Sequence, residues 1–155
     1  MLRAPAAVVL VVLAAGCGGT GGTGGAAAGQ PAERPGTAMI RLVRHEFAGR
    51  LDSSYAMLVR EQRAAINRDL YVHCPPGLST TDVKVEVVGV KDVVFDVPAL
   101  GKVPTKAVSF EMSVIGANGN RIMIPDTGHL IAQDGQWRWT LSRRSFSALL
   151  AGACP

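Results

Sequence analysis

The chain has 155 residues, a formal net charge of +4 and a hydrophobic fraction of 48%, and this length allows one globular domain. Its basic residues are spread along the sequence, with Arg143 and Arg144 as the only adjacent pair. Because nucleic-acid binding usually needs a clustered basic surface with aromatic residues, this distribution argues against a nucleic-acid partner.

The first sixteen residues have the features of a signal peptide. Arg3 supplies a positive charge, and residues 4–15 form an uncharged run of Ala, Pro, Val and Leu. The run has about twelve residues, whereas a helix that spans a bilayer needs about 20 apolar residues. Residues 1–16 are therefore predicted to be an export signal.

The segment from Leu13 to Cys17, LAAGC, places small residues directly before a cysteine and resembles the lipobox of bacterial lipoproteins. Ala14 departs from the larger aliphatic residue usual at its position. In that family the thiol receives a diacylglycerol and the chain is cut before the cysteine. The resemblance implies that Cys17 is lipidated and anchors the protein to membrane lipid, on the extracytoplasmic face of the cell membrane. The alternative is an ordinary secreted protein in which Cys17 has no special role.

Residues 18–36, GGTGGTGGAAAGQPAERPG, lack apolar periodicity and consist mainly of glycine and small residues. Such a composition is typical of flexible linkers. Residues 17–36 are thus predicted to form the lipidated anchor and its tether, with the globular domain at 37–155.

Two cysteines, Cys74 and Cys154, remain once Cys17 is assigned to the anchor. An exported protein folds in an oxidising compartment, where two remaining thiols usually pair. We therefore predict a Cys74–Cys154 disulfide. The alternative is a reactive thiol, for which the sequence offers no identifiable His or Asn arrangement.

Apolar residues recur at helical spacing over about 37–49, and again from Asp52 and Ser53 to about 72 with a break near residue 60. Asp52 and Ser53 are expected to cap the second stretch. Residues 146–150 predict a short terminal helix.

From residue 83 the apolar period changes to two, over 83–87, 108–114, 121–132 and 137–141. Hairpin turns are expected at Asn118-Gly119 and Asp134-Gly135, and Pro125 predicts a bulge or kink in its strand. Helices followed by a meander of strands indicate an α+β fold, with N-terminal helices packed on a curved, cone-like antiparallel sheet.

The domain resembles the nuclear-transport-factor-two-like (cystatin-like) domains of many actinobacterial lipoproteins. The resemblance covers residues 37–155. It is carried by the helical stretch from Phe47 to Cys74, the strand from Ala107 to Ile115, the segment DGQWRW from Asp134 to Trp139, and the closing Cys154-Pro155. It implies a fold rather than an activity, because this fold hosts isomerases, hydrolases, dehydratases and binding modules.

Enzymes of this fold use a carboxylate base with a Tyr or His partner in the mouth of the cone. The resemblance therefore implies a pocket that involves Tyr55, Tyr71, Asp126 and His129. These residues form no recognisable catalytic motif, and the three histidines lack the spacing of metal ligands. No catalytic residue, cofactor or metal is predicted. Trp137 and Trp139 share a strand face and are interpreted as core residues.

Two functions follow. The first is a non-enzymatic module of the cell envelope that binds a small apolar ligand or another envelope protein. The second is a small hydrolase or isomerase with its site in the cone. A pocket with a buried carboxylate beside a Tyr or His would favour the enzyme, whereas a filled cone or an apolar pocket would favour the binding module. The weak motif content favours the binding module.

Overall fold

The computed structural model describes residues 30–74, 82–115 and 119–155. The signal peptide, Cys17 and most of the tether lie outside these residues, as does Asn118 of the first expected turn. The elements in chain order are α1 (Pro35–Phe47), α2 (Leu51–Met57), α3 (Arg60–Ala65), α4 (Arg68–His73), β1 (Lys84–Val97), β2 (Gly101–Ile115), β3 (Arg121–Gln133), β4 (Gln136–Trp139) and α5 (Arg143–Leu150). No helix in the described residues is long and apolar enough to cross a bilayer.

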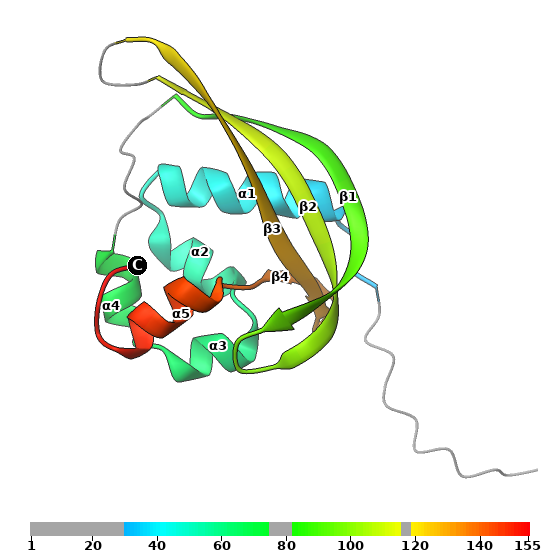
Figure 1. Cartoon of the computed structure of the whole chain (residues 1–155), viewed down its shortest axis with the longest axis vertical. Helices are drawn as coiled ribbons and strands as arrows, with labels where there is room; N and C mark the ends of the chain where they lie inside the picture. The colour runs from blue at the N-terminus through cyan, green and yellow to red at the C-terminus, as the bar shows by residue number, and fades with distance from the viewer. Residues whose placement is uncertain (1–29, 75–81, 116–118) are drawn as a thin grey trace, which may run out of the picture.

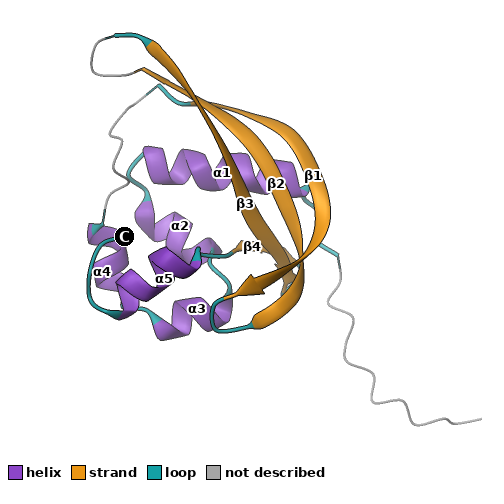
Figure 2. Ribbon diagram, in the orientation of Figure 1, coloured by secondary structure: helices purple, strands orange, loops and turns teal. Residues whose placement is uncertain are grey.

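The four strands form one antiparallel sheet in the order β1-β2-β3-β4. The sheet curves without closing, and the long strands arch around α1, which lies on their concave side (Figure 1). The remaining helices lie together on one side of α1, below it in this view, on the same concave side of the sheet (Figure 2). This arrangement confirms the predicted α+β fold with helices packed on a curved antiparallel sheet.

A first hydrophobic core lies between α1 and the sheet. Met39, Leu42 and Val43 recur on one side of α1 and are buried. They pack with Phe110 and Met112 of β2, whose alternate residues face the concave side. Burial of each such large side chain contributes roughly 1.5–3 kcal/mol, so this contact holds α1 inside the curve of the sheet.

A second core joins the short helices to the segment after β4. Its buried residues are Leu51, Leu58, Ile66, Tyr71, Leu141, Phe146 and Leu149. Trp139 packs against both cores. The predicted disulfide between Cys74, after α4, and Cys154, after α5, is confirmed, and it fastens the C-terminal segment to the helical layer.

The second helical stretch is divided further than expected. Asp52 and Ser53 do not cap it, since α2 begins at Leu51 after Arg50. A first break follows Met57, where the Val59 amide donates to the Trp139 carbonyl at 3.0 Å instead of continuing the helix. A second break precedes Asn67, whose side chain accepts from the Leu70 amide and starts α4.

The predicted irregularity at Pro125 is wrong. Pro125 pairs with Glu111 in an uninterrupted register. Since β4 pairs only with residues from Leu130 onward, β3 has a free edge at Pro125, where the missing N–H removes no ladder hydrogen bond. The register shift of the sheet lies instead in β1, between Val87 and Gly89.

The turn at Asp134-Gly135 is confirmed: both residues have positive φ, 53° and 69°, and they join β3 to β4. At the N-terminal side, contacts with the domain begin before residue 37. Pro31 is buried, and the Glu33 carbonyl accepts from Trp137 Nε1 at 2.6 Å. The last residues of the predicted tether therefore pack on the domain.

Candidate functional site

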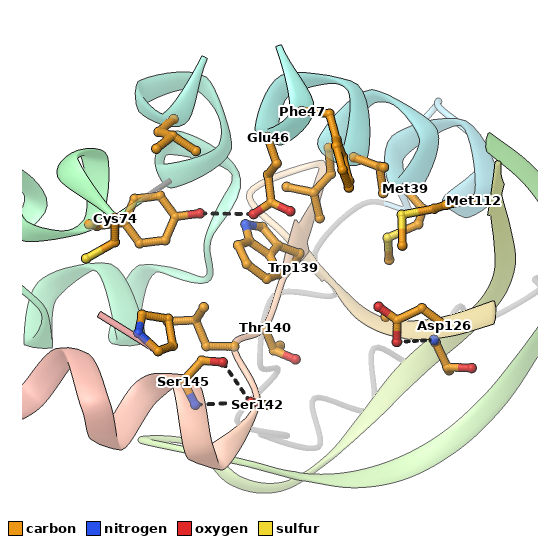
Figure 3. Close-up of a pocket in the computed structure, with 18 of the residues that line it drawn as sticks. Met39, Glu46, Phe47, Cys74, Met112, Asp126, Trp139, Thr140, Ser142 and Ser145 are labelled. Atoms are coloured by element: carbon orange, nitrogen blue, oxygen red, sulfur yellow. Dashed lines mark hydrogen bonds between the residues drawn. The ribbon is translucent and has the colours of Figure 1, made fainter. Parts of the chain in front are cut away.

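A cavity of about 550 Å³ lies between the two cores. Its walls come from α1, α2, α4, α5, β2, β3, β4 and the segment that follows β4. Figure 3 shows Met39 and Phe47 reaching it from α1, Met112 from β2, and Trp139 from β4. The cone is therefore hollow where the sheet curves away from the helices.

The wall is mixed, and its apolar surface only slightly exceeds its polar surface. The large apolar and aromatic residues that line the cavity are Met39, Leu42, Val43, Phe47, Leu51, Phe110, Met112, Trp139, Leu141 and Leu149. Polar atoms enter through Glu46, Tyr71, Asp126, Thr127, Thr140, Ser142 and Ser145. No Lys, Arg or His belongs to the lining among the described residues.

Glu46 is the acidic group set into the apolar wall. It stands seven residues after Met39, so α1 places it on the side that carries Leu42 and Val43. Its Oε1 accepts from the Tyr71 hydroxyl at 3.3 Å. Burial, with a smaller contribution from the nearby Asp126 carboxylate, raises the pKa of Glu46 to about 7, against the opposing effect of the Tyr71 hydrogen bond.

Tyr71 connects Glu46 to the second core. Its hydroxyl lies 3.0 Å from Ser54 Oγ, and Ser54 Oγ in turn donates to the Leu51 carbonyl at 3.1 Å. Burial raises the pKa of Tyr71 well above its ordinary value, and the neighbouring Glu46 adds to the effect. The phenol therefore stays protonated and serves as a hydrogen-bond donor to the carboxyl group.

Asp126 lies on the opposite wall, in β3 (Figure 3). It is paired in register with Phe110, and both side chains face the concave side. One oxygen, Oδ1, accepts from the Thr127 amide at 2.7 Å. Two residues along, Gly128 faces α1, and a Cβ atom there would lie 2.9 Å from Met39 Sδ. The bare glycine leaves room for the end of the Met39 side chain beside the cavity.

The structure brings two of the four sequence-predicted pocket residues together. Tyr71 and Asp126 line the cavity. Tyr55 contacts the Tyr71 ring, at 5.5 Å between centroids, but its hydroxyl donates to the Arg63 carbonyl at 2.8 Å, away from the cavity.

His129 lies on the other face of β3. Its ring stacks on Phe95 at 3.7 Å between centroids, and Nδ1 lies 3.2 Å from Thr105 Oγ1. Burial lowers the pKa of His129. The separation of three residues from Asp126 along a continuous strand places the two side chains on opposite faces. They therefore cannot act as a pair.

Sequence reasoning missed Glu46. The sequence does contain a signal for it. Glu46 lies seven residues after Met39, so it continues the apolar helical stripe of Met39, Leu42 and Val43, and it directly precedes Phe47. An acid on the buried stripe of a helix needs a partner or a shifted pKa, so it marks a site. Trp137 is a core residue as interpreted, whereas Trp139 also lines the cavity.

The described residues contain no group of three or more His, Cys, Asp or Glu side chains that could hold a metal ion. Comparisons with protein-family models, with curated proteins and with solved structures found no match to this chain.

Proposed function

We propose that this protein is a lipid-anchored, extracytoplasmic module of the cell envelope that binds a small, largely apolar ligand inside the cone. The cavity of about 550 Å³ carries the proposal. Ligand sites for small molecules generally have volumes of about 300–1,000 Å³, mostly apolar walls and a few converging polar groups. The cavity has a volume in this range, and its wall combines large apolar side chains with converging polar groups.

The energetics support an apolar occupant. Apolar side chains gain dispersion energy from close contact with apolar atoms. An apolar ligand that enters the cavity makes such contacts and gains roughly 25 cal/mol for each Å² of apolar surface removed from water. Phe47 and Trp139, which line the cavity and are only partly buried, offer that surface.

Trp139 supplies the experiment. The chain has two tryptophans, and Trp137 is buried in the first core with its indole bonded to the Glu33 carbonyl. Trp137→Phe therefore leaves Trp139 as the single indole, placed at the cavity. Titration with the neutral apolar fluorophore N-phenyl-1-naphthylamine is expected to enhance the emission of the probe, with energy transfer from Trp139.

A pair of matched variants tests the location. Val43→Phe fills part of the cavity and is expected to weaken binding of the probe. Val90→Phe makes the same change at an exposed position on β1 and is expected to leave binding unchanged. Absence of probe binding by the folded ectodomain, or equal binding by both variants, would contradict the proposal.

The membrane anchor is the second part of the proposal, and it is supported by the LAAGC segment that ends at Cys17. Two acyl chains give stable attachment to a bilayer, whereas one gives marginal binding. Intact-mass analysis of detergent-extracted protein is expected to give a mature chain that starts at an acylated Cys17. Cys17→Ser is expected to release the domain or block its maturation, and an unmodified Cys17 in the membrane fraction would contradict the anchor.

The resemblance to nuclear-transport-factor-two-like domains remains part of the proposal. It is supported by the placement of α1 against the concave side of a curved antiparallel sheet.

A second function, a hydrolase or isomerase, is favoured by one observation: a partly buried carboxyl, Glu46, lies beside a tyrosine in the cavity. A general acid or base works best with a pKa near the working pH, and that of Glu46 is raised to about 7. The two candidates differ in what becomes of the ligand. A binding module releases it unchanged, whereas an enzyme alters its mass, or its deuterium content in D₂O, and loses this ability in Glu46→Gln.

A further inference from the structure

We propose that the ligand of this cavity carries a protonated amine on its apolar body, and that Glu46 and Asp126 together bind the ammonium group. The inference rests on the proposed function, because it names the chemical class of ligand for the same cavity. It is drawn from the charges, hydrogen bonds and rings that face the cavity.

The charge on the wall has one sign. Glu46 and Asp126 are the acidic side chains of the described lining, which holds no Lys, Arg or His. Carboxylates near an apolar space are stable when they are paired or hydrogen-bonded. Asp126 is exposed to solvent and needs no partner, whereas Glu46 lies in the wall, where the described lining supplies no cation, so a cationic ligand completes the site at Glu46.

The Glu46 carboxyl group accepts a hydrogen bond from one side chain of the described residues. Its Oε1 accepts from Tyr71 at 3.3 Å, and no other side chain in the described residues donates to it. A carboxylate offers about four acceptor positions on two oxygens. An ammonium group has three donors and no acceptor, which matches the remaining positions.

Asp126 also keeps an oxygen for the cavity. Its Oδ1 is held by the Thr127 amide, which fixes the carboxyl group and leaves Oδ2 for a ligand. Both carboxyl groups line the same cavity, from α1 and from β3. A cation in that cavity is attracted by both acids, which a neutral alcohol is not.

Aromatic rings surround the same space. Phe47, Phe110 and Trp139 line the cavity together with Glu46, and Figure 3 labels three of these four side chains, Phe47, Trp139 and Glu46. The face of an aromatic ring attracts an ammonium group within about 6 Å by roughly 0.5–2 kcal/mol. The walls therefore suit both the charged head and the apolar body of such a ligand.

Positive charge near the cavity is directed away from it. Arg143 and Arg144, at the start of α5, are exposed, and Arg143 pairs with Asp96 at 2.7 Å, outside the cavity. At the N-terminus of α5, Ser142 Oγ accepts from the Ser145 amide. These contacts leave the acids as the dominant charges that a ligand meets.

The test uses three ligands with one tail: decylamine, decanol and decanoate, each below its micelle concentration. Their affinities are measured by displacement of N-phenyl-1-naphthylamine at pH 8, where Glu46 is ionised and an alkylamine is still protonated. Hydrogen bonds to charged groups predict that decylamine binds about tenfold or more tightly than decanol. Decanoate is expected to bind most weakly.

The two acids are then neutralised by combining Glu46→Gln and Asp126→Asn in one variant. The matched control is Glu86→Gln, because Glu86 is an exposed acid on β1. The preference for decylamine over decanol is expected to fall to about threefold or less when both acids are neutralised, and to stay unchanged in the control. Circular dichroism checks that each variant is folded.

The pH profile of the unaltered protein is an independent readout. The titratable side chains that line the cavity with Glu46 are Asp126 from β3 and Tyr71 from α4. The cavity-lining side chains from α2, α5, β2 and β4 are uncharged. Ionisation of Glu46 is therefore expected to strengthen decylamine binding between pH 6 and pH 8 and to weaken decanoate binding.

The outcomes separate the two proposals. If the neutral probe and decanol bind but decylamine has no advantage, the cavity binds apolar ligands and the amine inference is overturned. If neither the probe nor any of the three ligands binds, the proposed function itself fails. A decylamine preference that persists in the doubly neutralised variant overturns the role of Glu46 and Asp126.

Discussion

The Tyr71 hydroxyl lies between the carboxyl group of Glu46, at 3.3 Å, and the hydroxyl of Ser54, at 3.0 Å. One side chain thereby links α1, α2 and α4 at the edge of the cavity. The link is polar, yet it is surrounded by the apolar residues of the second core. It connects the stability of the helical layer to the ionisation of Glu46.

Tyr71→Phe tests this link. The change removes the donor to Glu46 and is expected to cost about 1–2 kcal/mol of unfolding free energy. Since the hydrogen bond from Tyr71 lowers the pKa of Glu46, that pKa is expected to rise further in the variant. A ¹³C NMR titration of the Glu46 carboxyl measures it, with Tyr55→Phe as the control, because the Tyr55 hydroxyl bonds Arg63 and not Glu46. An unchanged Glu46 titration in Tyr71→Phe would contradict the link.

The raised pKa of Glu46 predicts a pH dependence of stability. The folded-state pKa, about 7, lies above the reference value of 4.5, so folding is disfavoured when the group must ionise. The contribution of the protonated Glu46 side chain to the free energy of unfolding is fully present below about pH 4.5. It is lost as the pH rises through 7.

Glu46→Gln removes this dependence. The variant is expected to match the unaltered protein near pH 4 and to exceed it at pH 8, by up to about 3 kcal/mol. Urea unfolding of both proteins at several pH values measures the difference, in which the other titrating groups cancel. Parallel pH profiles for the two proteins would refute the assignment.

Gln62 predicts a second stability effect, away from the cavity. Its buried amide donates to the Pro98 carbonyl at 3.1 Å and accepts from the Leu141 amide at 2.8 Å. Gln62→Leu leaves both backbone groups without this partner and is expected to cost about 3 kcal/mol. Gln136→Leu, at an exposed position of β4, is the control for denaturant unfolding, and equal losses in the two variants would speak against this role.

Reduction of the Cys74–Cys154 disulfide is expected to destabilise the domain. The bridge closes a loop with a sequence separation of 80 residues, which corresponds to about 4.5 kcal/mol in the chain-entropy model. Both cysteines line the cavity, so probe affinity is expected to fall together with the melting temperature. Thermal unfolding with and without reductant measures the first effect, and two free thiols in the unreduced protein would contradict the bridge.

Periodicity and cysteine count were enough to predict much of the fold. The alternation of apolar residues around Val108 and Trp137 predicted strands, because a strand turns every second side chain to the same face. Asp134-Gly135 predicted its turn from the local tolerance for positive φ. The pairing of Cys74 with Cys154 followed from two thiols in an oxidising compartment. Each of these depends on local chemistry or on counting.

Contacts between distant segments decided the rest. The break near residue 60 was predicted, but the partner of the Val59 amide, the Trp139 carbonyl 80 residues away, is one that no local pattern can reveal. The role of Glu46 depends on how far the sheet curves from α1, since only that curvature leaves a space for its carboxyl to face. The separation of Asp126 from His129 follows from strand alternation once β3 is continuous. The sequence by itself thus determined which elements form, whereas tertiary packing decided which side chains share the cavity, because burial and register arise only when distant segments meet.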